Sequence, residues 1–318
     1  MTIAETLRPW ESFSHFSDDQ LERLAAGVAR RHYDDGEAIV RHRDSTREAY
    51  AIEAGGVAIQ RTSPYGEFRL ALLGTSDLFG ETSFVDGGER SGDAVALGGC
   101  DLLVFDPATL DTLVEDEPAL HVALYWTFWK SLSSKLRSTN ERLTRFFSET
   151  GSSTAVIDRP DAFAESGAFH VELRDKRRIF EEQKLSGLEI NFLSSLSKEQ
   201  KLDGGEVIFN EGDPGEAMYV VHDGRVMISK FIPGAGEEAL AFLERGDYFG
   251  EMALIDNQPR SADARADGGG AVVLAIPREV VEGILDIRKV SSLRLLKLLC
   301  ALVARRLREL DEKIVGWH

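Results

Sequence analysis

A glutamate and an arginine lie nine positions apart at two places in this sequence. Glu251 and Arg260 fall in FGEMALIDNQPRSADARA, and Glu81 and Arg90 fall in FGETSFVDGGERSGDAVA. The glycine before each glutamate lets a ligand approach the backbone closely. The arginine offers a fixed fork of donors suited to phosphate oxygens, and the glutamate can accept a hydrogen bond from a hydroxyl. The two pairs predict a small ligand with a phosphate at one end and a hydroxyl, for example that of a ribose, nearby.

These pairs belong to an internal repeat. The string YAIEAGGVAI at 50–59 matches YVVHDGRVMI at 219–228 with an offset of 169 positions, as GEAIV at 36–40 matches GEVIF at 205–209. The two FGE stretches match with an offset of 170, so the second copy has one extra residue, expected in the loop around IPGAGEE. Such self-similarity predicts two copies of one structural unit. Because the whole string recurs, a ligand site is favoured over a structural Glu–Arg salt bridge across a turn.

Each copy has the same order of predicted elements. A short helical stretch comes first, SDDQLERLAAGVARR in one copy and EINFLSSLSK in the other. Short, alternating, β-branched segments broken by glycine, aspartate and proline follow. This pattern is typical of an antiparallel sandwich or barrel rather than of a βαβ sheet.

Each copy ends in a long stretch with a heptad pattern. Spacings of three and four alternate from Val122 to Phe146 and again from Leu293 to Trp317. The pattern predicts long helices over about 118–147 and about 288–317, each packed against a partner helix. The alternative is that each helix packs on its own sheet, which accounts for the first two turns but not for about three heptads.

The repeat divides the chain into two expected domains, 1–147 and 176–318, joined by a linker at 148–175. The linker contains the string GSST and Pro160. Clusters of such residues are typical of loops. The charged stretch RDKRRIFEEQK that follows is expected to form the first helix of the second domain.

Composition limits the possible functions. The length of 318 residues suits two domains, and an apolar content of 43% can fill two cores. The net charge of −17 argues against wholesale nucleic-acid binding, and no apolar run approaches the roughly 18 residues of a membrane span. The N-terminus lacks the pattern of a secretory signal. Two cysteines, Cys100 and Cys300, make no disulfide framework, so a cytoplasmic location is expected.

The stretch FGEMALIDNQPRSADARA resembles the phosphate-binding cassette of cyclic nucleotide-binding domains of the catabolite activator and protein kinase A regulatory subunit type. GEVIFNEGDPGEAMYVVHDGRV resembles the strand–turn–strand segment ahead of it. The first copy departs from the pattern, because RHRDSTREAY lacks the turn glycines of NEGDPGEAMY. The resemblance implies a fold class of α+β, mainly β. Two antiparallel jelly-roll β-barrels would each be flanked by helices and end in a long helix, with no DNA-binding domain.

The resemblance also implies residue roles. Glu81 and Glu251 would bind a ribose 2′-hydroxyl, and Arg90 and Arg260 the cyclic phosphate. Backbone groups near the cassette glycines would complete the phosphate cradle, and a polar pair on each long helix would face the base. The implied ligand-binding residues are Gly80, Glu81, Thr82, Ser83, Arg90, Ser91, Thr139 and Asn140 in the first copy, and Gly250, Glu251, Met252, Ala253, Arg260, Ser261, Ala262 and Asp311 in the second.

The base is expected to be adenine. Thr139 and Asn140 suit the adenine amine, whereas Asp311 can accept from adenine or from guanine, or lie solvated on the helix surface. Members of the family that favour guanine usually have threonine after the cassette arginine, and this chain has Ser91 and Ser261 there. The resemblance therefore favours cAMP, with a cGMP-selective sensor or another cyclic nucleotide as the alternative.

The expected function is that of a non-catalytic sensor, without cofactor or metal, that changes helix position to regulate an unknown protein partner. The seven histidines have no metal-ligand spacing and no nucleophile–base motif is present, so a hydrolase or cupin-type metalloenzyme is only the rival class. A nucleotide-free scaffold is the third possibility. Retention of glutamate and arginine in both copies argues against it, since a buried unpaired arginine is costly.

The two long helices are expected to pair. A helix of about 25 residues is about 37 Å long, and the segment between the copies is long enough to return that far at roughly 3.3 Å per residue. One chain can therefore form an intramolecular pseudo-dimer with both helices in one seam. The alternative is a homodimer through one or both helices.

Overall fold

The protein is described by a computed structural model, which defines residues 1–63, 66–115, 117–148, 169–232, 236–285 and 293–316. The chain divides into two compact units. Unit 1 comprises Met1–Leu132 and Val303–His318, and unit 2 comprises Ser133–Leu302. Residues 149–168, most of the expected linker, lie outside the described residues.

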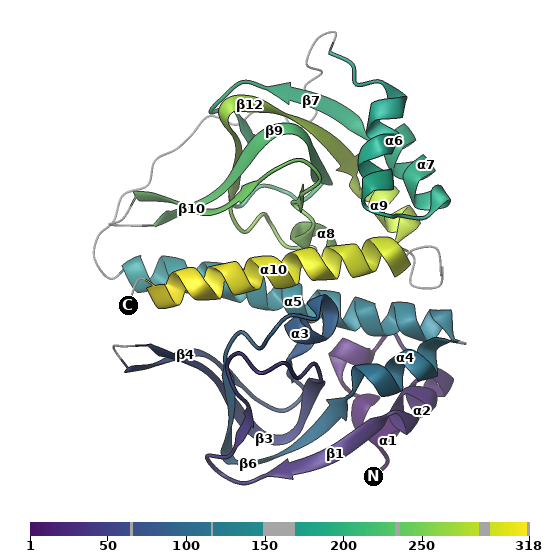
Figure 1. Ribbon diagram of the computed structural model, residues 1–318, viewed down its shortest axis with the longest axis vertical. Coiled ribbons are helices and arrows are strands. Elements are labelled where there is room, and N and C mark those ends of the chain that lie inside the picture. Colours follow the sequence, from purple (N-terminus) through teal and green to yellow (C-terminus); the bar gives the residue numbers. More distant parts are fainter. Residues whose placement is uncertain (64–65, 116, 149–168, 233–235, 286–292, 317–318) are drawn as a thin grey trace. The chain divides into compact units, whose positions relative to one another are not determined.

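Unit 1 contains a six-stranded antiparallel sheet and short helices (Figure 1). Its elements in chain order are α1 (Ile3–Leu7), η1 (Glu11–Phe13), α2 (Asp18–Ala26), β1 (Val28–Tyr33), β2 (Ala38–Val40), β3 (Ala49–Ser63), β4 (Gly66–Leu73), β5 (Leu78–Phe79), α3 (Glu81–Asp86), β6 (Asp93–Phe105), α4 (Pro107–Glu115) and the start of α5 (Pro118–Ser148).

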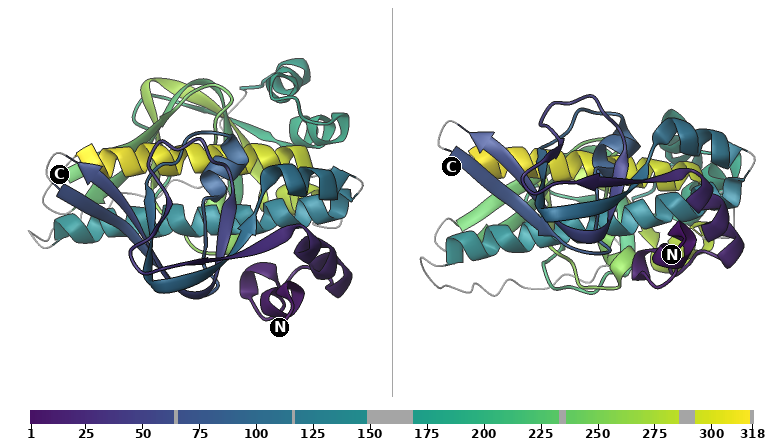
Figure 2. Two further views of the ribbon diagram at one scale, coloured as in Figure 1. Left: turned by 60° about the horizontal axis from the view of Figure 1, so that its bottom comes forward. Right: turned by 90° about the horizontal axis from the view of Figure 1, so that it is seen from below.

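The sheet of unit 1 has the order β1-β6-β3-β4, with β2 paired to β6 and β5 paired to β3. Strands β3 and β6 form its centre, where Tyr50 pairs with Val104 and Ala58 with Val95. The inward residues of these strands form an apolar core that includes Ile52. Helices α1, α2 and α4 lie at one end of the sheet (Figures 1 and 2).

The N-terminal helices have clear local causes. Ser17 caps α2 in a capping box with Gln20, and the helix ends before Gly27. The expected helical stretch is therefore shorter than SDDQLERLAAGVARR, because its last residues enter β1.

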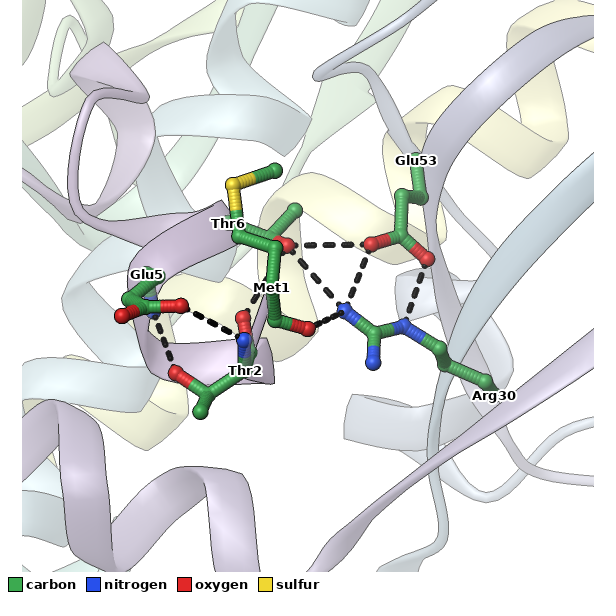
Figure 3. Close-up of polar contacts among 6 residues, drawn as sticks. All are labelled: Met1, Thr2, Glu5, Thr6, Arg30 and Glu53. Carbon is green, nitrogen blue, oxygen red and sulfur yellow. Dashed lines mark hydrogen bonds and ion pairs between the residues drawn. The ribbon is translucent and has the colours of Figure 1, made fainter.

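The shorter helix α1 is held to the sheet by a polar network (Figure 3). Thr2 forms a capping box with Glu5. The guanidinium of Arg30 donates to both carboxylate oxygens of Glu53 at 2.8 Å, and also to the hydroxyl of Thr6.

Unit 2 repeats this plan. Its elements are the end of α5, α6 (Leu173–Glu182), α7 (Gly187–Leu196), β7 (Lys198–Leu202), β8 (Val207–Phe209), β9 (Ala217–Ile232), β10 (Gly236–Leu243), β11 (Tyr248–Phe249), α8 (Met252–Asp256), β12 (Asp263–Pro277), α9 (Arg278–Ile284) and the start of α10 (Leu293–Gly316). The sheet order is β10-β9-β12-β7, with β11 on β9 and β8 on β12. Helices α6, α7 and α9 gather at one end of it (Figure 1).

The predicted fold class is confirmed: the chain is mainly β with flanking helices, and all strand pairs described are antiparallel. The two sheets are jelly-roll-like rather than closed barrels. A glycine that recurs in both copies lies where two central strands of the sheet approach each other closely. Gly55 has a φ of +85° and Gly224 a φ of +73°, and a Cβ on either would lie 2.2 Å from a carbonyl oxygen of the neighbouring strand. Only glycine fits such a close approach.

The extra residue of the second copy lies between β9 and β10. β3 ends at Ser63 and β9 at Ile232, an offset of 169, whereas β4 begins at Gly66 and β10 at Gly236, an offset of 170. Residues 233–235, within the predicted loop, lie outside the described residues.

Both long helices are present, as α5 and α10. Heptad positions stay buried far along each of them, from Val122 to Leu136 in α5 and from Leu296 to Leu310 in α10. The last predicted positions, the side chain of Phe146 and all of Trp317, lie outside the described residues. No helix among those described has both the length and the apolar composition needed to cross a membrane.

Candidate functional site

The second cassette joins β11 to α8 through Gly250 and Glu251. Gly250 has a φ of +75°, and a Cβ there would lie 2.6 Å from Nη1 of Arg260. Glycine is therefore needed for the arginine to reach the backbone. Glu251 is 2% exposed, and Met252 and Ala253, which begin α8, are also buried.

Arg260 is the centre of this cassette and is 4% exposed. Its Nη1 donates to the carbonyl oxygen of Gly250 at 2.6 Å, and its Nη2 donates to that of Ala217 at 2.7 Å. Among the described residues, its buried Nε has no hydrogen-bond partner, and the guanidinium contacts no carboxylate. The side chain is thus positioned and desolvated, and its Nε–H has no acceptor among the described residues.

Aromatic rings hold this guanidinium from the sheet side. Its central carbon lies 4.2 Å from the ring centroid of Phe209 and 5.7 Å from that of Tyr219. Burial lowers the pKa of Arg260. Burial disfavours the charged form of Arg260, because the guanidinium is removed from water. An anion bound beside the guanidinium would stabilise this charged form and offset the free-energy cost of burial.

Helix α5 also contributes to unit 2, from Ser133 onward. Arg137 donates to both carboxylate oxygens of Asp256, at 2.6 and 3.2 Å, and to the carbonyl oxygen of Pro259 at 2.9 Å. One turn further, Nδ2 of Asn140 lies 3.5 Å from Oγ of Ser261. Asn140 and its neighbour Thr139 belong to the first copy of the repeat, yet they lie in the unit that contains the second cassette.

The first cassette has the same backbone. Gly80 has a φ of +78°, and Glu81, Thr82 and Ser83 at the start of α3 are buried. Glu81 is 1% exposed and accepts a hydrogen bond from Oγ of Ser131, on α5, at 2.7 Å.

Arg90, in contrast with Arg260, has partners for each of its nitrogens. Nε donates to Oγ1 of Thr46 at 3.0 Å, Nη1 to the carbonyl oxygen of Gly80 at 3.2 Å, and Nη2 to the carboxylate of Glu48 at 3.4 Å. Its guanidinium lies 5.6 Å from the ring centroid of Tyr50. Burial lowers the pKa of Arg90 and raises the pKa of Tyr50 to about 12.

The last part of α10 belongs to unit 1, where Arg308 contacts the first cassette. Arg308 donates to both carboxylate oxygens of Asp86, at 2.8 and 3.1 Å, to Oγ of Ser83 at 3.1 Å, and to the carbonyl oxygen of Glu89. Asp311, three residues further along α10, is partly buried.

The structure therefore brings the predicted residues together in two groups. The glycine, glutamate and arginine of each cassette lie together within one unit. The partly exposed Ser91 accompanies them in unit 1, and Ser261 and the buried Ala262 accompany them in unit 2. The long-helix residues are exchanged relative to the repeat: Asn140 lies at Ser261 in unit 2, and Asp311 lies in unit 1.

Sequence reasoning missed two arginines. Arg137 and Arg308 lie 171 positions apart, as the two heptad patterns do. The sequence alone could have indicated them, because an arginine recurs at the same position of both heptad patterns. Ser131, Thr46 and Glu48 were also missed, and they have no counterparts of the same type in the second copy.

The turn before β3 also differs between the copies. Arg43 has a φ of +68° at the position where the second copy has Gly212, with a φ of +86°. A left-handed conformation costs little for glycine and more for arginine. The first copy therefore keeps the shape of the turn without its glycine.

No group of three or more His, Cys, Asp or Glu side chains forms a potential metal site within the described part of the chain.

Comparison with known proteins matches both copies to one family. The profile of the family described as "Cyclic nucleotide-binding domain" matches residues 30–117 and 199–288. These two segments contain both cassettes and make up more than half of the chain.

Two curated relatives illustrate the likeness. A cyclic AMP receptor protein of Thermus thermophilus is 37% identical over 123 residues, which are 39% of this chain and 55% of the relative. A cAMP-dependent protein kinase regulatory subunit of Dictyostelium discoideum is 23% identical over 261 residues, 80% of this chain and 65% of the relative. The chain thus spans less than two thirds of the length of either relative.

Among solved structures, the regulatory domain of Toxoplasma gondii PKA with cAMP is 19% identical. The alignment covers 89% of this chain and 90% of that one, with a TM-score of 0.34.

Proposed function

This chain belongs to the cyclic nucleotide-binding domain family, and we propose that it is a non-catalytic regulatory protein that binds a cyclic mononucleotide, with cAMP favoured. Binding would change the position of the long helices and so alter a surface that a protein partner recognises. Regulatory function is supported by the relative of Dictyostelium discoideum, whose name is that of a protein kinase regulatory subunit.

The observation that carries this proposal is the state of Arg260. A guanidinium that is 4% exposed, with an unused donor and no carboxylate contact among the described residues, is costly without an anion. A cyclic phosphate would supply that anion in the geometry that guanidinium groups prefer. Glu251, buried nearby, would accept the ribose hydroxyl.

The preference for adenine is supported by residues beside the phosphate position. Asn140 lies at Ser261, so an amide and a hydroxyl border the second site where a base would extend. Names of the relatives from Thermus and Dictyostelium refer to cAMP. The alternative, cGMP, is supported by the carboxylate of Asp311 in unit 1, because a carboxylate can accept both donors of guanine.

Coupling of ligand to helix is supported by Arg137 and Arg308. Each links a long helix to the cassette of its unit through a carboxylate and a carbonyl oxygen. If phosphate binding moves the cassette, the helix must follow or these charged contacts must break. A ligand can shift such an equilibrium only by its difference in affinity for the two states.

Pairing of α5 and α10 within one chain, or between two chains, stays a prediction. The unit boundaries support the version within one chain, since each unit contains part of both long helices. Light scattering tests it: a particle of twice the 35.2 kDa chain mass would contradict the simple intramolecular version.

The test of the proposed function is calorimetric titration of the purified chain with cAMP and with cGMP. We expect cAMP to bind, and Arg260→Gln or Glu251→Gln to weaken the second site by about a hundredfold, the scale of a lost charge-assisted hydrogen bond to the phosphate or to the ribose hydroxyl. Arg225→Gln is the matched control. Arg225 is half exposed and pairs with Asp267 in the same unit, so its loss should leave binding unchanged.

Absence of binding with both nucleotides, checked by thermal shift, would contradict the proposal and favour the nucleotide-free scaffold. Binding that survives both cassette substitutions would contradict the site.

A further inference from the structure

The two cassette arginines differ in what faces them. Arg260 donates to the backbone carbonyl oxygens of Gly250 and Ala217, and its Nε has no partner among the described residues. Arg90 donates to one carbonyl oxygen, to the hydroxyl of Thr46 and to the carboxylate of Glu48.

The difference comes from two positions of the repeat. Thr46 and Glu48 correspond, at the offset of 169, to Gly215 and Ala217. In the second copy these positions have no polar side chain, and Gly215 cannot gain one, because a Cβ there would lie 2.2 Å from Cβ of Ala253. The first copy places a hydroxyl and a carboxylate at the same two positions.

Glu48 is close enough to act as a counter-ion. Its carboxylate lies 3.4 Å from Nη2 of Arg90, and the two side chains are 21% and 3% exposed. A partly buried carboxylate at this distance neutralises the charge that a phosphate would otherwise neutralise.

The hydroxyl-binding end of the first site is also engaged. Glu81 accepts a hydrogen bond from Ser131 at 2.7 Å. Both residues that would hold a ligand in unit 1 thus already contact polar side chains of the chain itself.

We propose that Glu48 is a built-in counter-ion of the first site, which competes with the phosphate of the ligand and makes this site the weaker of the two. The inference rests on the proposed function, because it assumes that the ligand has a phosphate. It implies that the second site fills first and that the first site responds only at higher nucleotide concentration.

The test measures the first site alone, in chains that carry Arg260→Gln. We compare this background with versions that add Glu48→Gln, or Glu48→Gln together with Thr46→Val. Both changes keep the shape of the side chain, so folding is preserved, and circular dichroism verifies it. Glu67→Gln is the matched control, because it removes the same charge from an exposed position of β4.

Two probes are used, cAMP by calorimetry and inorganic phosphate by thermal shift at constant ionic strength. Glu48→Gln should strengthen cAMP binding at the first site about tenfold, the scale of one charge-assisted contact that no longer has to be displaced. It should also produce a phosphate-dependent rise in Tm that the background and the Glu67→Gln control lack.

The two probes separate this inference from the proposed function. A gain in phosphate binding without any cAMP binding would support the counter-ion role and contradict the proposed ligand. Unchanged cAMP affinity and an unchanged response to phosphate would overturn the inference, while cAMP binding at the second site in the unmodified chain would leave the proposed function intact.

Discussion

Arg137 binds Asp256 through two hydrogen bonds, from Nε at 2.6 Å and from Nη2 at 3.2 Å. Arg308 contacts Asp86 in the same way, at 2.8 and 3.1 Å. In both units the residue that a long helix holds is the last residue of the short cassette helix, α8 or α3. The cassette of each unit is therefore connected to a long helix by one charged, largely buried contact.

Arg308→Gln should loosen this connection in unit 1. We expect a loss of about 1–3 kcal/mol of stability, since a charged hydrogen-bonded pair with about 20% exposed side chains is broken. Thermal unfolding measures the loss. Arg178→Gln on α6 is the control, because Arg178 is 73% exposed and lies 3.3 Å from Glu182 one turn away, so it should cost less than about 0.5 kcal/mol. Equal effects of both substitutions would contradict a special role for Arg308.

Gly215→Ala should damage the second site through packing. The new Cβ would lie 2.2 Å from Cβ of Ala253, so the cassette helix has to shift. We expect a cost of about 1–3 kcal/mol, typical of overpacking, and weaker cAMP binding at the second site. Gly269→Ala is the control, because no atom lies within 4 Å of a Cβ there. Calorimetry and thermal unfolding should show an effect for Gly215 alone.

Asn140→Ala should weaken nucleotide binding at the second site rather than the first. Asn140 lies 3.5 Å from Ser261 in unit 2, although it belongs to the first copy of the repeat. We expect about a fivefold loss, the scale of one hydrogen bond. Titration with cAMP assigns the effect to a site. Asn140→Ala is combined with Arg90→Gln, which leaves the second site to be measured, and with Arg260→Gln, which leaves the first. A loss confined to the Arg260→Gln background would show that Asn140 serves the first site.

Glu199 should make unit 2 sensitive to acid. Burial is the largest single influence on the pKa of Glu199 and raises it, but the hydrogen bond and charge of Lys176, 2.5 Å away, a backbone hydrogen bond and the hydrogen bond from His170 together outweigh burial and lower the pKa to about 2. The folded pKa is below the ordinary value of 4.5, so this stabilisation is present above about pH 5 and is lost as the pH falls toward 2.

Glu199→Gln removes that dependence. The variant should lose about 2–4 kcal/mol near pH 7, because the buried Lys176 loses its carboxylate partner. Its stability should then fall less steeply than that of the unmodified chain between pH 5 and pH 2. The free energy of unfolding is measured by urea unfolding at each pH. If it fell equally steeply in the variant and in the unmodified chain between pH 5 and pH 2, the assignment to Glu199 would be contradicted.

The repeat, the element types and the cassette residues follow from the sequence alone. Glycines 80, 250, 55 and 224 all have a positive φ, a backbone conformation that favours glycine and that the local sequence can therefore indicate. The spacing from Glu251 to Arg260 is also local, because one short helix and one turn separate the two residues. Periodicity alone predicted α5 and α10, since burial along a helix repeats with its turn.

Tertiary structure decided which side chains meet across long sequence distances. Nothing in the spacing of Arg90 shows that Glu48 faces it, because 42 residues separate the two and only the pairing of strands brings them together. The same holds for Arg308 and Asp86, 222 positions apart. Sequence motifs show that a phosphate site can exist, whereas the charges that compete for its arginine depend on packing, because electrostatic contacts act across space and not along the chain.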